Sequence, residues 1–141
     1  MAETNELIIH ADGGARGNPG PAAIGAVIKN NQNQVLARIS QTVGNKTNNE
    51  AEYLAVIAVL KQVSDKKLQP QKILLNVDSQ LIYHQLSGSY KVKKEHLQKL
   101  LWEIRTLENS LNCPIFYKLI PREQNRAADA LVNQALDSLL K

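Results

Sequence analysis

The chain has 141 residues, of which 43% are hydrophobic and 21% are charged, and its formal net charge is +4. This size and composition predict one globular domain over residues 1–141 that needs no disulfide bonds. The single cysteine, Cys113, excludes a disulfide framework and a cysteine-rich zinc site, and it indicates a reducing, cytoplasmic compartment.

Neither a membrane span nor a secretory signal is expected. No apolar run approaches the roughly 18 residues that a membrane helix needs. The acidic Glu3 and Glu6 are unlike the basic start of a signal peptide. The positive charge fits a polyanionic partner, but many basic proteins bind no nucleic acid, so the charge alone does not decide the function.

Residues 7–28, LIIHADGGARGNPGPAAIGAVI, predict a strand, a glycine-rich turn and a second strand that runs back. From Leu7 to Asp12 the residues alternate with the period of two of a strand, so we expect Asp12 at its carboxyl end. The turn holds four glycines: Gly13, Gly14, Gly17 and Gly20. Their backbone can approach a ligand closely, and the Asn18 amide can both donate and accept hydrogen bonds. We therefore expect Asp12 to bind metal and the turn to contact a sugar-phosphate backbone.

The remaining elements follow from periodicity and capping signals. Thr47 and Glu50 have the spacing of a capping box, and Gly88 suits the position that follows a helix. In chain order, we expect strands over 22–29 and 35–40, a helix over 47–67, a strand over 72–78, a short helix over 79–88, a helix over 97–111, a strand over 114–120 and a terminal helix capped by Asn125 or a neighbour.

This order, βββ-α-β-α-α-β-α, predicts an α/β fold with a five-stranded mixed sheet flanked by helices. Ligands of such sheets bind at the carboxyl ends of strands, near a switch in strand order. Asp12 and Asp78 are each expected at a strand end, so they are candidates to meet there.

Two further acids lie on apolar faces of predicted helices. At about 100° per residue, Glu52 points toward the apolar side of its helix, whereas Glu50 shares a face with Lys61. In the terminal helix, Asp129 lies over apolar residues and Asp137 lies on a polar stripe. An ionised carboxylate on an apolar face is costly unless a positive group meets it.

Four inward carboxylates would repel one another strongly without a counterion. Oxygen ligands without nearby His or Cys favour Mg²⁺ or Mn²⁺ over zinc. Two such ions about 3.5–4 Å apart can activate a water and stabilise the leaving oxygen in phosphodiester hydrolysis. The four acids therefore suggest a metal-dependent phosphodiesterase.

Four segments resemble the successive motifs of the type 1 ribonuclease H family: DGGARGNPGPAAIGAVI, TNNEAEYLAVIAVL, VDSQLIYHQLSGSYKVK and REQNRAADALVNQA. The match runs from about Leu7 to near the C-terminus, and it implies a ribonuclease H-like fold. It places the metal-binding, catalytic acids of the family on Asp12, Glu52, Asp78 and Asp129. The resemblance implies cleavage of the RNA strand in RNA–DNA hybrids with two Mg²⁺ ions, or Mn²⁺ instead, leaving 5′-phosphate and 3′-hydroxyl ends. We expect a monomer.

The resemblance also implies a set of substrate contacts. Amides and backbone groups can donate to and accept from a 2′-hydroxyl, which DNA lacks. The contacts near the site fall on the backbone of Gly13 and Gly14 and on Asn18, Asn48, Asn49 and Gln80. Thr47 and Asn18 are candidates for a DNA phosphate contact.

The sequence departs from the family pattern in two places. The extended basic handle of some members is reduced to SGSYKVKKEHL, where Lys91, Lys93 and Lys94 partly substitute, so we expect weaker and more salt-sensitive binding. The loop IPREQN lacks the mobile histidine of several members, so Arg122 or Glu123 is the candidate for proton transfer or product release.

Other interpretations stay open. Taken alone, Asp78 suits a helix N-cap, Asp12 suits a turn, and the lysines suit a solvated surface. At the level of function, the alternatives are a catalytically silent ribonuclease H-like binding module, or a nuclease of the same fold that acts on double-stranded RNA or on DNA with embedded ribonucleotides. A metal-free RNA-binding protein leaves the inward acids unexplained.

Overall fold

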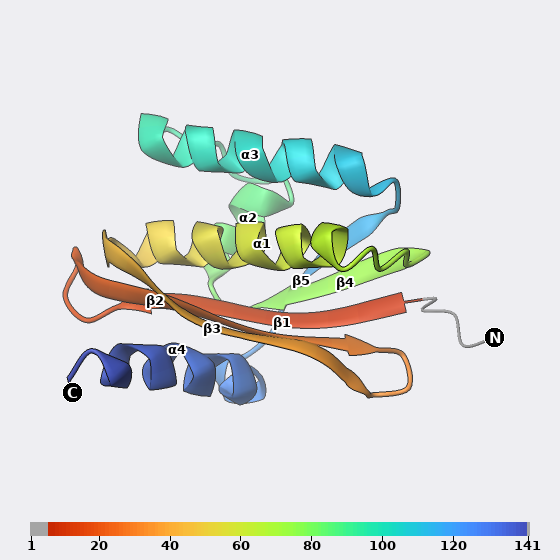
Figure 1. The fold of residues 1–141 in the computed structure, drawn as a ribbon. Coiled ribbons are helices and arrows are strands. Elements are labelled where there is room, and N and C mark those ends of the chain that lie inside the picture. Colours follow the sequence, from red (N-terminus) through yellow and green to blue (C-terminus); the bar gives the residue numbers. More distant parts are fainter. Residues whose placement is uncertain (1–5, 141) are drawn as a thin grey trace.

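The computed structural model of the chain describes residues 6–140, so Glu3 lies outside it. It contains a five-stranded mixed sheet with helices on both faces (Figure 1). The elements are β1 (Glu6–Ala15), β2 (Gly20–Asn30), β3 (Val35–Lys46), α1 (Asn48–Asp65), β4 (Lys72–Val77), α2 (Gln80–Leu86), α3 (Glu95–Leu111), β5 (Ile115–Leu119), the 3₁₀ turn η1 (Arg122–Gln124) and α4 (Arg126–Ser138). The predicted fold class and order of strands and helices are confirmed.

The strand order across the sheet is β3-β2-β1-β4-β5. β1, β2 and β3 pair antiparallel, whereas β4 runs parallel to β1 and to β5. In the register of β1 and β4, His10 lies opposite Asn76. Continuing that register by two residues places Asp78, just past the end of β4, beside Asp12. The predicted meeting of these two acids therefore follows from the strand pairing.

Three strands are longer than the sequence predicted: β2 (Gly20–Asn30) by two residues at its start and one at its end, and β1 and β3 by more. β1 does not end at Asp12 but continues through Gly13 and Gly14 to Ala15, so Asp12 lies inside the strand and the turn is shorter than expected. β3 continues to Lys46 because its second half pairs with the start of β2. Glycines and polar residues weaken the sequence signal of a strand, but hairpin pairing holds them in the ladder.

Gly13 lies within β1 because α1 crosses the strand there. A Cβ at Gly13 would lie 2.2 Å from the carbonyl oxygen of Ala51 in α1, whereas real Cβ contacts are longer than 3.0 Å. Gly14 has no such constraint, since its nearest neighbours would be 3.9 Å away. The first glycine of the pair therefore serves packing, and it brings α1 against the strand that carries Asp12.

The predicted cap of α1 and the predicted end of α2 are confirmed, since Gly88 follows the C-cap Ser87 with a φ of 86°. Thr47 Oγ1 accepts a hydrogen bond from the backbone N–H of Glu50, and the Glu50 carboxylate accepts one from the N–H of Thr47. Ser79, rather than Asp78, caps α2 by accepting from the N–H of Ile82. The alternative assignment of Asp78 as a helix cap is therefore wrong, which leaves its carboxylate available to the site.

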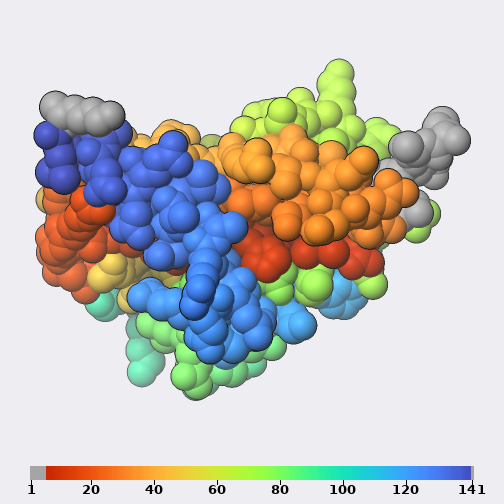
Figure 2. Space-filling model, turned by 90° about the horizontal axis from the view of Figure 1, so that it is seen from below, coloured from red at the N-terminus to blue at the C-terminus, as the bar shows by residue number. Residues whose placement is uncertain are grey.

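The core lies between the sheet, α1 and α3, as Figure 1 shows. Tyr53, Leu60 and Ile104 are among its fully buried side chains. α4 covers the opposite face of the sheet, where it lies across β2 and β3 (Figure 2). Between α2 and α3 the chain has only the short segment 87–94, as expected for the form without a basic handle. Within residues 6–140, no helix has the combination of length and apolar composition that a bilayer crossing requires.

We predict that Gly13→Ala lowers the free energy of unfolding by roughly 1–3 kcal/mol, because the added methyl overlaps the α1 backbone. The matched change Gly14→Ala adds the same methyl at an ordinary contact distance of 3.9 Å from its nearest neighbours and should cost less than about 1 kcal/mol. Urea denaturation of both variants measures the difference. Equal losses would show that the approach of α1 is not what requires glycine at position 13.

Candidate active site

Three carboxylates meet where β1, α1 and the end of β4 come together. Asp12, Glu52 and Asp78 each offer an oxygen atom, and these oxygens all lie within 4.8 Å of one another. Asp12 is 4% exposed, and the other two residues are partly buried. The structure thus brings together three of the four acids predicted from the sequence.

The backbone of Gly13 helps to fix two of these acids. Its N–H donates to Glu52 Oε1 at 2.6 Å and to Asp12 Oδ1 at 3.0 Å. The first bond requires α1 to lie directly against β1, which the missing side chain of Gly13 permits. The choice of Glu52 over Glu50 is supported by these contacts, because Glu50 is occupied in the cap of α1.

The cluster carries uncompensated negative charge. Burial raises the pKa of Asp12 to about 6, and the charges of Asp78 and Asp129 add to the effect while hydrogen bonds oppose it. Burial also raises the pKa of Glu52 well above its usual value, and the neighbouring Asp12 raises it further. Across residues 6–140, no Lys, Arg or His forms an ion pair with any of the four acids.

Asp129 lies near the cluster but is not part of it. It is partly buried on the first turn of α4 and lines the same cavity of about 460 Å³ as Asp12 and Glu52. The amide of Asn133 donates weakly to its Oδ2 at 3.4 Å. The structure therefore places Asp129 at the rim of the site, close enough for its charge to raise the pKa of Asp12.

Five of the twelve predicted substrate-contacting or assisting residues line this cavity. Asn48 Oδ1 accepts from the N–H of Ala15, and Asn18 Oδ1 accepts from the N–H of Asn48, so these asparagines join the β1–β2 turn to the start of α1. The predicted residues that line the cavity are Gly13, Gly14, Asn48, Asn49 and Arg122.

The other predicted residues lie outside the cavity lining. Gln80 is exposed at the start of α2, close in sequence to Asp78. Glu123 is exposed in η1, the neighbour of the cavity-lining Arg122. The three lysines of segment 87–94, Lys91, Lys93 and Lys94, are all exposed and do not line the cavity.

Two residues at the site were not singled out by sequence reasoning. Arg16 lines the cavity, and its guanidinium donates to Asp137 at 2.7 Å and to Asn133 at 3.4 Å. Asn125 is fully buried and donates to Asp78 Oδ2 at 2.8 Å, although the sequence predicted only a helix cap there. Neither contact has a local signal, because each joins residues that are distant in the sequence.

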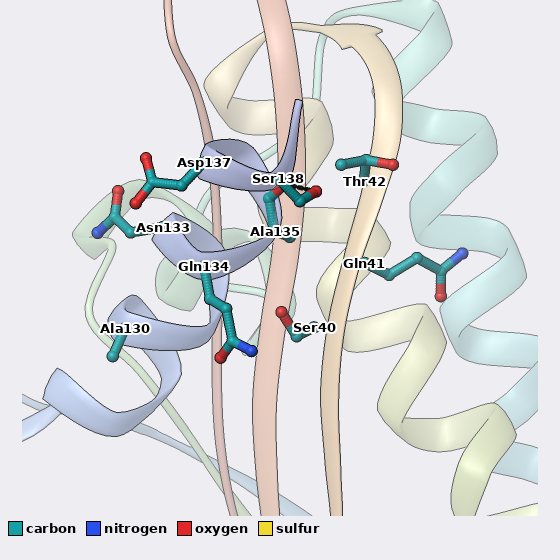
Figure 3. A pocket seen from close by; sticks show the side chains of 9 residues that line it. All are labelled: Ser40, Gln41, Thr42, Ala130, Asn133, Gln134, Ala135, Asp137 and Ser138. Atoms are coloured by element: carbon teal, nitrogen blue, oxygen red, sulfur yellow. Dashed lines mark hydrogen bonds between the residues drawn. The ribbon is translucent and has the colours of Figure 1, made fainter. Parts of the chain in front are cut away.

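A larger groove of about 910 Å³ lies between β3 and α4 (Figure 3). Its lining is mostly hydroxyl and amide side chains, such as Ser40, Thr42 and Gln134, and it includes none of the four acids. Asn133 lines both this groove and the acidic cavity. The groove therefore lies beside the candidate site. The acids Asp12, Glu52 and Asp129 line the smaller cavity and not the groove.

The cluster fits a hard divalent cation. Its ligands are carboxylate oxygens only, as Mg²⁺ and Mn²⁺ prefer. Burial, and after it the charges of Asp78 and Asp129, raise the pKa of Asp12, and no Lys, Arg or His within residues 6–140 forms an ion pair with the cluster to offset them. A bound cation would supply a positive charge there.

We predict that Asp12→Asn stabilises the metal-free chain. The folded-state pKa of about 6 exceeds the ordinary value of 3.8, so the folded chain binds more protons than the unfolded chain between these values. Its free energy of unfolding therefore falls as pH rises from about 4 to 6. At pH 7.5 in EDTA, Asp12→Asn should gain about 1–3 kcal/mol in urea denaturation and should weaken this pH dependence.

The exposed Asp137 provides the control for this experiment. Asp137→Asn removes a carboxylate that is paired with Arg16 and should lose up to about 1 kcal/mol, the opposite sign. An Asp12→Asn variant that is less stable than the wild type in EDTA would contradict the repulsion within the cluster.

Comparison with known proteins relates this geometry to a family. Residues 10–135 match the family described as Reverse transcriptase-like. Ribonuclease HI of Halobacterium salinarum is 39% identical over 131 residues, which cover 92% of this chain and 64% of that protein. The Bifunctional protein Rv2228c of Mycobacterium tuberculosis is 41% identical over 134 residues, or 94% of this chain. The chain spans only about a third of the length of that relative, 36%.

A solved structure agrees with these relatives. The crystal structure of LC11-RNase H1 in complex with an RNA/DNA hybrid has 40% sequence identity and a TM-score of 0.90, covering 96% of this chain and 99% of that one. The matches in sequence and in structure both extend over nearly the whole chain. The chain therefore belongs to the type 1 ribonuclease H family.

Proposed function

We propose that this chain is an endoribonuclease that hydrolyses the RNA strand of RNA–DNA hybrids and leaves 5′-phosphate and 3′-hydroxyl ends. The observation that carries the proposal is the cluster of Asp12, Glu52 and Asp78, whose charge no protein cation balances in residues 6–140. The similarity to LC11-RNase H1, whose structure contains an RNA/DNA hybrid, supports the choice of substrate.

In this proposal Asp12, Glu52 and Asp78 hold divalent cations, and Asp129 completes the set from the rim. When bound, two Mg²⁺ or Mn²⁺ ions would supply Lewis-acid activation of a water and would stabilise the leaving oxygen. The Gly13 N–H fixes one oxygen of Glu52 and one of Asp12, which limits the rotation of both carboxylates. Preorganised ligands of this kind bind a cation without the cost of ordering side chains.

The β1–β2 turn and the start of α1 contact the substrate in this proposal. Asn18 and Asn48 hold the turn against the helix, so the backbone of Gly14 and the amides of Asn48 and Asn49 face the cavity as a rigid unit. Groups that both donate and accept suit a ribose 2′-hydroxyl. Gln80 would extend this surface beyond Asp78.

Thr47 and Asn18 are the proposed contacts of a DNA phosphate. The Thr47 hydroxyl accepts from the N–H of Glu50, which leaves its own O–H able to donate to a phosphate oxygen. The positive end of α1 begins at the next residue, and such helix starts favour anions.

The remaining basic residues have secondary roles in the proposal. Arg122 and Glu123 are both exposed, but only Arg122 lines the cavity, so it is the better placed of the two to assist proton transfer or product release. Lys91, Lys93 and Lys94 would bind the hybrid in place of the basic handle. Their exposure makes this contribution sensitive to salt.

A cleavage panel tests the proposed function. The RNA strand is labelled in three substrates: an RNA–DNA hybrid, double-stranded RNA, and duplex DNA that contains one ribonucleotide. We expect cleavage of the hybrid in Mg²⁺ and none in EDTA. Hybrid binding without cleavage in Mg²⁺ or Mn²⁺ would instead indicate a silent binding module, and preferential cleavage of double-stranded RNA would indicate a nuclease of the same fold with another substrate.

Paired substitutions test which acids take part. We predict that Glu52→Gln, like Asp12→Asn and Asp78→Asn, lowers kcat by on the order of 10²–10³-fold, the loss typical when one preorganised electrostatic group is removed. Glu50→Gln keeps a side chain that can complete the capping box, so its kcat should stay within about twofold of the wild type. Steady-state cleavage of the hybrid measures both. If Glu52→Gln keeps the wild-type kcat and Glu50→Gln lowers it, then Glu50 rather than Glu52 is the catalytic acid.

A further inference from the structure

Asn125 occupies the N-cap position of α4 but does not cap the helix. An asparagine there normally accepts a hydrogen bond from a backbone N–H of the first turn. In this chain the Asn125 side chain makes no such bond. Its Nδ2 instead donates to Asp78 Oδ2 at 2.8 Å and to the carbonyl oxygen of Ala11 at 3.0 Å. The side chain is therefore directed away from its own helix and toward the acidic cluster.

This arrangement costs stability. Asn125 is fully buried, and its Oδ1 has no hydrogen-bond partner among the described residues. A buried acceptor without a partner and a lost capping bond each lower the stability of the folded state. Rotating the Asn125 amide by 180°, which exchanges Oδ1 and Nδ2, would not give Oδ1 a hydrogen bond. It would then face Asp78 Oδ2 and the Ala11 carbonyl oxygen, which are both acceptors. Another role must account for a side chain held in this way.

Asn125 joins the three chain segments that carry Asp12, Asp78 and Asp129. Ala11, which accepts from Nδ2, directly precedes Asp12 in β1. Asp78, the other acceptor, follows β4. The carbonyl oxygen of Asn125 accepts from the N–H of Asp129 at 3.1 Å. One residue thus contacts Asp78 directly and, through backbone atoms, the segments that carry Asp12 and Asp129.

We propose that Asn125 is a positioning residue for the metal site of this chain. Its amide holds one oxygen of Asp78, so the carboxylate keeps a single orientation toward Asp12 and Glu52. A neutral donor suits this task better than Lys or Arg, because a positive side chain would balance the cluster and compete with the cation. The inference rests on the proposed function, since it assumes that the cluster binds metal.

Asn125→Ala tests the proposal, with Asn30→Ala as the matched control. Asn30 is also buried, and its side chain bonds to Gln34 and accepts from the N–H of Gln32. It lies at the other end of the β1–β2 pair, opposite Leu7, whereas Asp12 lies opposite Gly25. Both changes delete the same amide from a buried site, so a general loss of packing affects both.

The first readout is Mn²⁺ binding by titration calorimetry, without substrate. We expect Asn125→Ala to weaken the Kd for Mn²⁺ by about 10–100-fold, the effect typical of residues that orient metal ligands. Asn30→Ala should lower Tm but keep the wild-type Kd. The second readout is cleavage of the hybrid at saturating Mg²⁺, where Asn125→Ala should lower kcat and leave KM unchanged.

A second variant, Asn125→Ser, keeps the proposal testable if Asn125→Ala does not fold. Serine is a good N-cap, so this variant can cap α4, but its shorter side chain cannot reach both Asp78 and Ala11. We expect it to be at least as stable as Asn125→Ala and to show the same loss of Mn²⁺ affinity. Wild-type Mn²⁺ affinity in both Asn125 variants would overturn the positioning role alone. A wild-type chain that binds no Mn²⁺ would overturn the metal site and the positioning role together.

Discussion

The repulsion among Asp12, Glu52 and Asp78 is the constraint on which the rest of the site depends. Their oxygens lie within 4.8 Å of one another, and the pKa of Asp12 is raised to about 6. Flexible side chains would separate under this repulsion. Here each acid is attached to a different rigid element, and the packing of those elements keeps the carboxylates together. The packing of the core thus keeps the three carboxylates close together, although their mutual repulsion is unfavourable when no cation is bound.

The contacts that hold the acids are backbone and amide donors rather than positive side chains. The Gly13 N–H contacts Asp12 and Glu52, and the Asn125 amide contacts Asp78. Neutral donors orient a carboxylate and leave its charge in place. Arg16, the arginine of the β1–β2 turn, is instead paired with Asp137. The site therefore combines fixed geometry with a negative charge that remains available to a cation.

Periodicity and capping signals predicted most of the fold. The order of strands and helices, the N-cap of α1, the end of α2 at Gly88 and the inward face of Glu52 all depend on residues close together in the sequence, so local rules could predict them. The extension of β1 through Gly13 and of β3 to Lys46 did not follow, because tertiary pairing overrides weak strand signals there. The contact of Asn125 with Asp78 could not be predicted either, since the two residues are 47 positions apart in the sequence.

The most direct test is a crystal structure of this chain grown with Mn²⁺, with data collected at a wavelength where manganese scatters anomalously. The account predicts anomalous density in contact with Asp12, Glu52 and Asp78, while the carboxylates keep the separation found here. A map without manganese at this position, or a structure in which the three carboxylates have moved apart, would contradict it.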